Sequence, residues 1–255
     1  MDRDRAVAVL LAHLGKPDHG IRVTVHVVSI LSAVPAEAAN PWFSWSYVTE
    51  YSDELIEAGK QHVYLTVAAV LLALVFAFPL AVLVRRYRRM EGAVLGLSGV
   101  LYTIPSLALI SLLWPIFGLS ATTVIVALAV YALLVVLRNT LVGLEGVPAD
   151  VVDAAHGMGM GKRETLFKVQ LPLAMPTILA GVRIATVSTV GMVTIGALVG
   201  YGGFGQLILS GFQQNFYHAQ IATATICCVL LALIFEVLLL GLQRGLTPWA
   251  ARRSA

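Results

Sequence analysis

Arg183 and Glu236 are two charged side chains that fall within otherwise uncharged apolar segments of this 255-residue chain. A charge at membrane depth is costly, and it commonly marks a transport pathway or pairs with a partner across helices. Both residues lie toward one end of their segments, however, from which a long side chain can reach the membrane surface. Arg183 therefore either lines a pathway or pairs between subunits, or it reaches the surface. Glu236 either lines a pathway or pairs with Arg244.

The other reactive residue types form no catalytic or metal-binding pattern. Cys227 and Cys228 are adjacent within an apolar run and lack the spacing of a zinc motif, so we interpret them as packing residues. No phosphate-binding GxxxxGK segment followed by Ser or Thr occurs, so any ATP hydrolysis would need another chain. We expect no enzymatic activity, no metal site and no cofactor in this chain. The histidines share no ligand spacing, and we expect a surface role for each: His13, His19, His26, His62, His156 and His218.

The composition indicates that lipid, not water or nucleic acid, surrounds most of the chain. Apolar residues make up 58% of the sequence and charged residues only 12%. Soluble domains carry roughly 25% charged residues. The class of soluble globular domains is therefore excluded, and we expect an integral membrane protein.

Five apolar segments are long enough to cross a membrane as helices. The uncharged stretch from Gly92 to Leu137 would measure about 69 Å as a single helix, more than twice the hydrocarbon thickness of about 30 Å. It must fold back, and residues 114–120, which combine Pro115 with Gly118, are the expected break. The predicted fold is an all-α integral membrane protein. Its spans cover about residues 63–84, 94–113, 121–138, 175–199 and 221–242.

Two short features interrupt these segments. Pro105, close after Thr103, lies inside the second predicted span and frees a backbone carbonyl. Such a break is tolerated where it faces protein or a water-filled path, so Thr103 and Pro105 are candidate pathway residues. Gly202, Gly203 and Gly205 are expected to form a turn after the fourth span, followed by a short surface helix.

The N-terminal segment, residues 1–60, is expected to lie outside the cytoplasm. Residues 1–40 fit a signal-like segment, an extra span or an extension, and the sequence does not choose among them. Aromatic residues then gather at 42–47, as is typical of a membrane interface. Ser52 is predicted to start a short helix that lies along the membrane surface before the first span.

Basic residues predict the orientation in the cell membrane. Eleven Lys and Arg residues lie in the intervals 85–91 and 138–172 and in the C-terminal tail, whereas the intervening loops 114–120 and 200–219 have none. Positive charge favours the cytoplasmic side, so the C-terminus is expected inside and the N-terminus outside. The transmembrane domain then covers residues 61–243, and residues 244–255 form a cytoplasmic tail.

The polar loop from Asp150 to Pro172 has an unusual pattern. The pattern consists of Asp153, Ala154, Ala155, Gly159, Val169, Leu171 and Pro172 at fixed offsets. Pro148 and Asp150 favour a helix start, and the glycines at 157–161 predict a hinge before a second short helix that ends at Pro172. A small-faced helix of this kind suits docking into a groove on a partner protein.

This pattern resembles the EAA loop of membrane subunits of binding-protein-dependent ABC importers, with Asp153 in place of Glu and Val169 in place of Ile. Segments 102–109, 137–140, 180–183 and 202–205 resemble permeases of the glycine betaine, carnitine and choline class. The resemblance implies a type I ABC importer permease fold and separate ATP-binding subunits docked on the loop. It also implies a second permease chain, in a homo- or heterodimer, and an extracytoplasmic solute-binding protein. That protein would dock, and the gate would close, near the 202–205 glycines.

Three rival functions are weaker. An ABC permease for another small solute, such as methionine, differs only in cargo, and the cargo is not readable from this chain. A membrane enzyme would need converging titratable groups, and only Arg183 and Glu236 lie within spans. A passive channel would leave the 150–172 loop unexplained.

Overall fold

The computed structural model describes residues 40–251. The chain divides into two compact units, Met1–Pro41 and Trp42–Ala255, and the helices described below belong to the second. The alternatives for residues 1–40 fall almost wholly outside the described range, as do the last four residues of the tail, 252–255. Within residues 40–251 every regular element is helical, which confirms the predicted all-α class.

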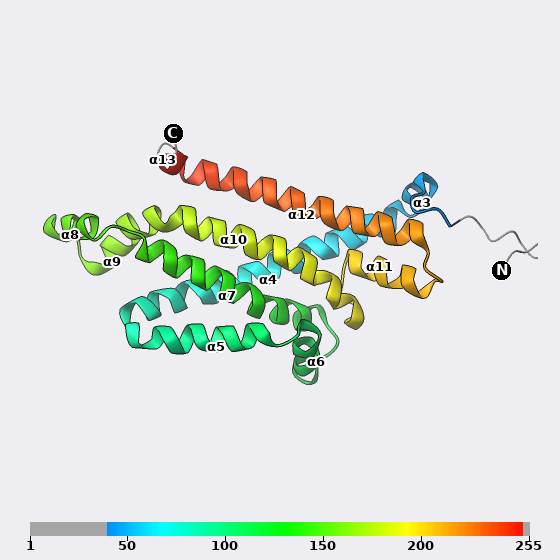
Figure 1. Ribbon diagram of the computed structural model, residues 1–255, viewed down its shortest axis with the longest axis horizontal. Coiled ribbons are helices and arrows are strands. Elements are labelled where there is room, and N and C mark those ends of the chain that lie inside the picture. The colour runs from blue at the N-terminus through cyan, green and yellow to red at the C-terminus, as the bar shows by residue number, and fades with distance from the viewer. Residues whose placement is uncertain (1–39, 252–255) are drawn as a thin grey trace, which may run out of the picture. The chain divides into compact units, whose positions relative to one another are not determined.

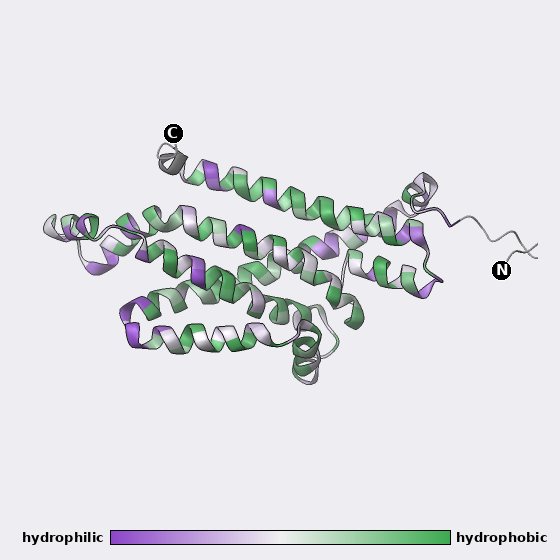
Figure 2. Ribbon diagram, viewed as in Figure 1, coloured by the Kyte–Doolittle hydropathy of each residue, from purple (hydrophilic) through white to green (hydrophobic). Residues whose placement is uncertain are grey.

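The principal helices run in the order shown in Figure 1. They are α3 (Trp45–Glu50), α4 (Ser52–Arg86), α5 (Glu91–Thr103), α6 (Ser106–Phe117), α7 (Ala121–Glu145), α8 (Ala149–Gly157), α9 (Lys162–Thr165), α10 (Leu171–Val193), α11 (Phe204–Gln213), α12 (His218–Leu246) and α13 (Pro248–Ala251). Short 3₁₀ turns lie at Arg88–Met90 and Thr194–Val199, and a π-helical turn lies at Leu166–Gln170. Figure 2 shows apolar residues along most of the long helices, as a lipid environment requires.

Four single helical segments are long and apolar enough to cross a membrane, and the pair α5–α6 makes a fifth if it is one bent span. The long segments are Ser52–Arg86, Ala121–Glu145, Lys162–Val199 and His218–Leu246. The five-span prediction is therefore confirmed in outline. Each predicted span was too short, because polar residues continue these helices past the apolar stretch.

The second predicted span was wrong in shape, because 94–113 is not one helix. The chain bends by 98° between α5 and α6. Ile104 has extended backbone angles, and Pro105, which lacks an N–H, caps the start of α6. The Tyr131 hydroxyl of α7 donates to the Ile104 carbonyl, so this break is held by a neighbouring helix. The predicted fold-back at 114–120 is confirmed, with Gly118 at φ 71°.

The short helix predicted to start at Ser52 is not a separate element. Ser52 begins α4, a continuous helix of 35 residues, with Asp53 and Glu54 favourably placed in its first turn. No proline or strained backbone interrupts it before Pro79, so the polar first turns simply extend the span. The separate short helix is α3, capped by Ser44, whose Oγ accepts from the Tyr47 N–H.

The fourth span also begins differently from the prediction. Pro172 was expected to end the loop's second helix, but it lies at the start of α10, two residues after the π-helical turn. The π-helical turn Leu166–Gln170 runs directly into α10 without a break. The polar loop is therefore attached to the fourth span through continuous helical backbone.

Small residues hold the central helices together. Ala73, Ala77 and Ala81 of α4 are fully buried against α7. Gly181 of α10 meets Asn139 of α7 so closely that an added Cβ would lie 2.3 Å from the Asn139 Cβ. Close backbone approach of this kind is the usual way in which helices associate in lipid. By contrast α12 lies at the edge, against α10 and α11, with a largely exposed apolar surface.

Candidate functional site

Helix α8 ends in a glycine-dependent cap that turns the chain back sharply. The Met160 N–H donates to the Ala155 carbonyl (3.1 Å), and the Gly159 N–H donates to the His156 carbonyl (2.9 Å). This pair of bonds is a Schellman motif, which places residue 159 in the left-handed region. Gly159 has φ 85°, a conformation that side chains with a Cβ rarely adopt. The hinge predicted at residues 157–161 is therefore confirmed and is centred on Gly159.

The motif residues of the loop divide into outward and inward groups. Asp153 and Ala154 are exposed on α8, whereas Ala155 is only 1% exposed. Val169 is half-buried in the π-helical turn, as are Leu171 and Pro172 at the start of α10. Beneath them, Val152, Leu166 and Leu171 pack against a buried cluster made by the end of α7 and the start of α10. The inward residues thus attach α8 to the spans, and the outward ones are left for a partner.

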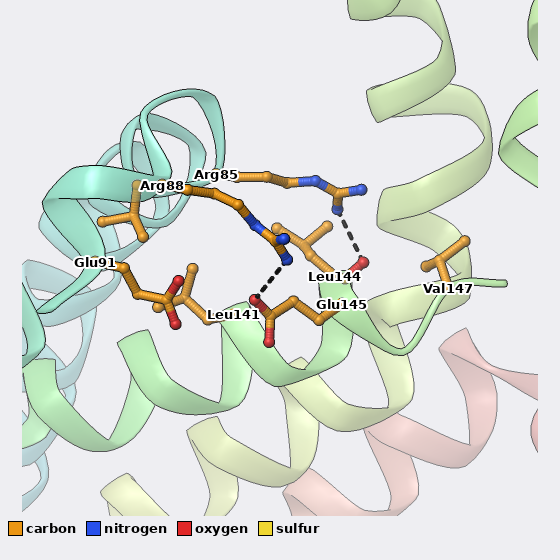
Figure 3. Close-up of a pocket in the computed structure, with 8 residues that line it drawn as sticks. Arg85, Arg88, Glu91, Leu141, Leu144, Glu145 and Val147 are labelled. Carbon is orange, nitrogen blue, oxygen red and sulfur yellow. Dashed lines mark hydrogen bonds and ion pairs between the residues drawn. The ribbon is translucent and has the colours of Figure 1, made fainter. Parts of the chain in front are cut away.

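Two arginines, Arg85 in the last turn of α4 and Arg88 in the 3₁₀ turn that follows, contact the end of α7 (Figure 3). The Arg85 Nη1 donates to the Leu144 carbonyl (2.9 Å), one of the last carbonyls of α7. The Arg88 Nη2 lies 3.8 Å from the Glu145 Oε1. These contacts border a pocket of about 260 Å³ between α4, α5 and α7. The end of α7 is therefore tied to α4 immediately before the chain enters α8.

At the opposite end of α10, the predicted turn at 202–205 is confirmed as a packed glycine turn. A Cβ on Gly205 would lie 2.4 Å from the Thr194 carbonyl oxygen, and one on Gly203 would lie 2.6 Å from the His62 Cβ. Gly203 also has φ 53°. No larger residue fits at either position, so the turn packs backbone against backbone. The predicted short helix is α11, but it does not lie free on the surface: Leu207 and Gly211 are buried, and the helix packs against α12.

His62, expected at the surface, is fully buried and holds this turn. Its Nδ1 accepts from the Phe204 N–H (3.3 Å), and its Nε2 lies 2.9 Å from the Val190 carbonyl. Since a carbonyl only accepts, Nε2 carries the hydrogen and the ring is the neutral Nε2 tautomer. The neighbouring Gln61 Oε1 accepts from the Gly203 N–H (2.8 Å).

Two backbone groups far from His62 in the sequence bind its buried imidazole. One is the Val190 carbonyl, where α10 is about to change into a 3₁₀ turn, and the other is the first N–H of α11. The signal in the sequence was the pair Gln61-His62 at the head of an apolar run. Its partners lie more than 120 residues away, so periodicity could not reveal them.

The candidate pathway residues do not come together. The Arg183 Nε of α10 lies 3.1 Å from the Glu236 Oε1 of α12, and its Nη1 donates weakly to the Gln243 Oε1 (3.4 Å). Glu236 therefore pairs with Arg183 and not with Arg244. Thr103 and Pro105 are exposed at the α5–α6 bend. Within the part of the chain from 40 to 251, no three His, Cys, Asp or Glu side chains converge as a metal site would require.

Curated relatives match most of this chain. It is 36% identical to the glycine betaine/carnitine/choline transport system permease protein OpuCD of Bacillus subtilis over 203 residues, which cover 80% of this chain and 89% of that protein. It is also 36% identical to the osmoprotectant import permease protein OsmW of Salmonella typhimurium, covering 81% of this chain and 98% of that protein. The choline transport system permease protein OpuBB of Bacillus subtilis is 33% identical, covering 78% and 92%.

Solved structures show the same fold. A chain of the MetNI methionine ABC transporter in an inward-facing conformation superposes with a TM-score of 0.69 at 21% identity, covering 78% of this chain and 98% of that one. The family model of the binding-protein-dependent transport system inner membrane component matches residues 69–252. The resemblance first noted in the 150–172 loop is thereby confirmed, and the chain belongs to the family of inner membrane components of binding-protein-dependent transport systems.

Proposed function

We propose that this chain is a permease subunit of an ATP-driven importer of osmoprotectants of the glycine betaine, choline and carnitine class. The observation that carries the proposal is the combination of α8, with Asp153 and Ala154 exposed, and the packing of this loop against the buried cluster at the ends of α7 and α10. The names of the relatives at 33–36% identity favour the osmoprotectant class. The similarity to the methionine transporter, at 21% identity, concerns the fold alone and does not favour methionine as cargo.

In this proposal α8 docks on a separate ATP-binding subunit. Movement of that subunit reaches α10 along continuous helical backbone from Lys162 to Val193, and it reaches α7 and α4 through the contacts of Leu144 and Arg85. Because these contacts are buried or hydrogen-bonded, α8 moves together with the spans and not as a loose loop. The chain itself performs no hydrolysis and needs no cofactor, because ATP is bound by the partner.

The remaining partners follow from the same architecture. A second permease chain, identical or related, completes the translocation path. An extracytoplasmic solute-binding protein delivers cargo near the glycine turn at 202–205. The end of the helices that carries the 150–172 loop and its basic residues faces the cytoplasm. The N-terminal segment lies on the outer side of the cell membrane. The tail beyond Arg244 remains on the cytoplasmic side.

Uptake of labelled glycine betaine and choline by membrane vesicles tests the cargo. The vesicles contain this chain, its ATPase and its solute-binding protein, and they are assayed with and without ATP. ATP-dependent accumulation of either compound is the expected result. An assembled complex that accumulates neither compound but accumulates methionine would replace the osmoprotectant assignment by the methionine alternative.

Charge reversal on α8 tests the coupling role. Asp153→Lys leaves the buried contacts of the loop untouched, so the complex reaches the membrane, yet ATP-dependent uptake is lost. Asp53→Lys makes the same charge change on the first turn of α4 and serves as the control with uptake retained. Normal uptake by Asp153→Lys would contradict docking through this face.

A further inference from the structure

A second, larger pocket lies between the last turns of α4 and the α8–α9 segment. Its volume is about 730 Å³. The connection from α4 to α5 and the helices α8 and α9 lie at the same end of the helices (Figure 1). The lining residues are Val82, Arg85, Arg86, Tyr87, His156, Lys162, Arg163, Thr165, Leu166 and Gln170.

The charged part of this lining is entirely basic. Four side chains are permanently positive, Arg85, Arg86, Lys162 and Arg163, and no carboxylate lines the pocket. In the described range, the ion pairs of basic residues involve Lys60, Arg88, Lys168 and Arg183, and none involves these four. Glu145 acts electrostatically on Arg85 but does not line the pocket. Four like charges around one cavity create a strongly positive potential, which an anion would relieve.

Two of the four cations are already positioned. Arg85 is half-buried and held by the Leu144 carbonyl. The Arg86 Nε donates to the Tyr87 hydroxyl (3.2 Å), and its guanidinium lies 5.5 Å from the centre of the Tyr87 ring. Guanidinium groups fixed in this way retain free N–H donors that suit bidentate contacts with phosphate oxygens.

The rest of the lining is apolar or uncharged. Val82 belongs to the last apolar turn of the α4 span, and Leu166 begins the π-helical turn. A pocket that joins an apolar wall to a cluster of arginines, at the end of a membrane helix, matches the chemistry of a lipid at headgroup depth. Basic pockets between transmembrane helices on the cytoplasmic side are known to hold anionic lipid headgroups.

We propose that this pocket is a binding site for the phosphate headgroup of an anionic phospholipid. The phosphate lies among Arg86, Lys162 and Arg163, and the glycerol and upper acyl chain lie against Val82. The inference rests on the proposed function in one respect, because the pocket must face the cytoplasmic leaflet, where such lipids attract basic segments. A lipid held here would bridge α4 and the segment that carries α8, so lipid composition would influence how firmly α8 is attached.

Lipid retention tests the site without any transport assay. The complete complex is purified in mild detergent from membranes that contain phosphatidylglycerol, and bound phosphatidylglycerol is counted by native mass spectrometry. The test variant is Arg86→Gln/Lys162→Gln/Arg163→Gln. The control, Arg89→Gln/Arg138→Gln/Arg244→Gln, removes the same charge from exposed residues outside the pocket. A direct charge-assisted contact with a phosphate oxygen is worth a factor of about ten or more, so the loss of such contacts lowers retention in the test variant at least about tenfold. In the control, retention changes less than about twofold.

Several outcomes would overturn the site. Equal retention in the two variants, or an equal loss, would show a diffuse charge effect. Loss of the ATPase subunit from the test variant alone, with lipid unchanged, would make the pocket a protein contact. Displacement of phosphatidylglycerol by millimolar glycerol phosphate or inorganic phosphate would assign it to a soluble anion. If the triple variant does not assemble, Lys162→Gln and Arg163→Gln singly give the same comparison. Failure of glycine betaine uptake would leave the lipid result unaffected.

Discussion

The chain segments at the two ends of α10 differ in polarity and in packing. From Pro148 to Gln170 the chain presents polar and charged side chains outward, and it consists of a capped helix, a short second helix and a π-helical turn. From Gly200 to Gly205 it presents almost none, because Gly202 to Gly205 are buried and backbone packs on backbone. The first end therefore leaves polar side chains accessible, whereas the second end is closely packed.

The largest effect is expected where the glycine turn is filled. Gly205→Val places side-chain atoms against the Thr194 carbonyl, which an added Cβ would approach to 2.4 Å, and backbone cannot easily yield. We expect little folded protein in the membrane. Gly241→Val, in α12 with open space around the Cβ, is the control and keeps its wild-type level. The measurement is the yield of monodisperse protein by fluorescence-detected size exclusion, and equal yields would remove the distinction between the two ends.

Removal of the buried imidazole of His62 should have the second largest effect on stability. His62→Leu keeps volume but leaves the Val190 carbonyl and the Phe204 N–H without partners, at a cost of about 1–3 kcal/mol each. The midpoint of thermal unfolding of the purified complex should fall markedly. The control is Tyr64→Leu, two residues on and exposed. A variant as stable as wild type would show that the turn does not depend on His62.

The effect of a substitution in the hinge at 157–161 should depend on the backbone conformation of the residue replaced, and not on the space around it. Gly159 and Gly157 both have nothing within 4 Å of a built Cβ, but only Gly159 has positive φ, 85°. Gly159→Val should therefore cost about 1–2 kcal/mol in local strain and redirect the chain after α8, whereas Gly157→Val should not. Coupled uptake, with protein amount normalised, measures the difference. Loss of coupling in both variants alike would point to bulk on α8 as the cause.

The smallest effect on stability is expected from Tyr47, whose ring packs against the ring of Tyr217. Its hydroxyl is buried and has no hydrogen-bond partner among the described residues. Tyr47→Phe should leave thermal stability unchanged or raise it by up to about 1 kcal/mol. Burial raises the pKa of Tyr47 from 10.0 to about 12. The folded state therefore holds the Tyr47 proton more tightly than the unfolded state does. The contribution of this difference to the free energy of unfolding is complete below pH 10 and declines as the pH rises toward 12. That decline should be absent in Tyr47→Phe, which pH-dependent unfolding would detect.

Local patterns in the sequence were sufficient to predict the all-α membrane class, the number of apolar segments and the motif of the 150–172 loop. Apolar run length located the spans, and the glycines at 157–161 and 202–205 located both turns. Three features escaped it for physical reasons. The 98° bend at Pro105 depends on Tyr131 of another helix, which holds the Ile104 carbonyl. Partners distant in sequence decide the burial of His62 and the Arg183–Glu236 pair, and no periodicity encodes them.

The most direct test of the account is a cross-link from each end of the helices to the ATPase subunit. A cysteine at the exposed Ala154 of α8 is compared with one at the exposed Gln214, which follows α11 at the other end. Both are placed in a chain whose native half-buried pair, Cys227 and Cys228, is replaced by alanine. A short heterobifunctional reagent that joins cysteine to lysine should link the Ala154 position, and not the Gln214 position, to the ATPase subunit in assembled complexes. Cross-linking from Gln214, or none from Ala154 in an assembled complex, would contradict the assignment of the loop end as the docking face.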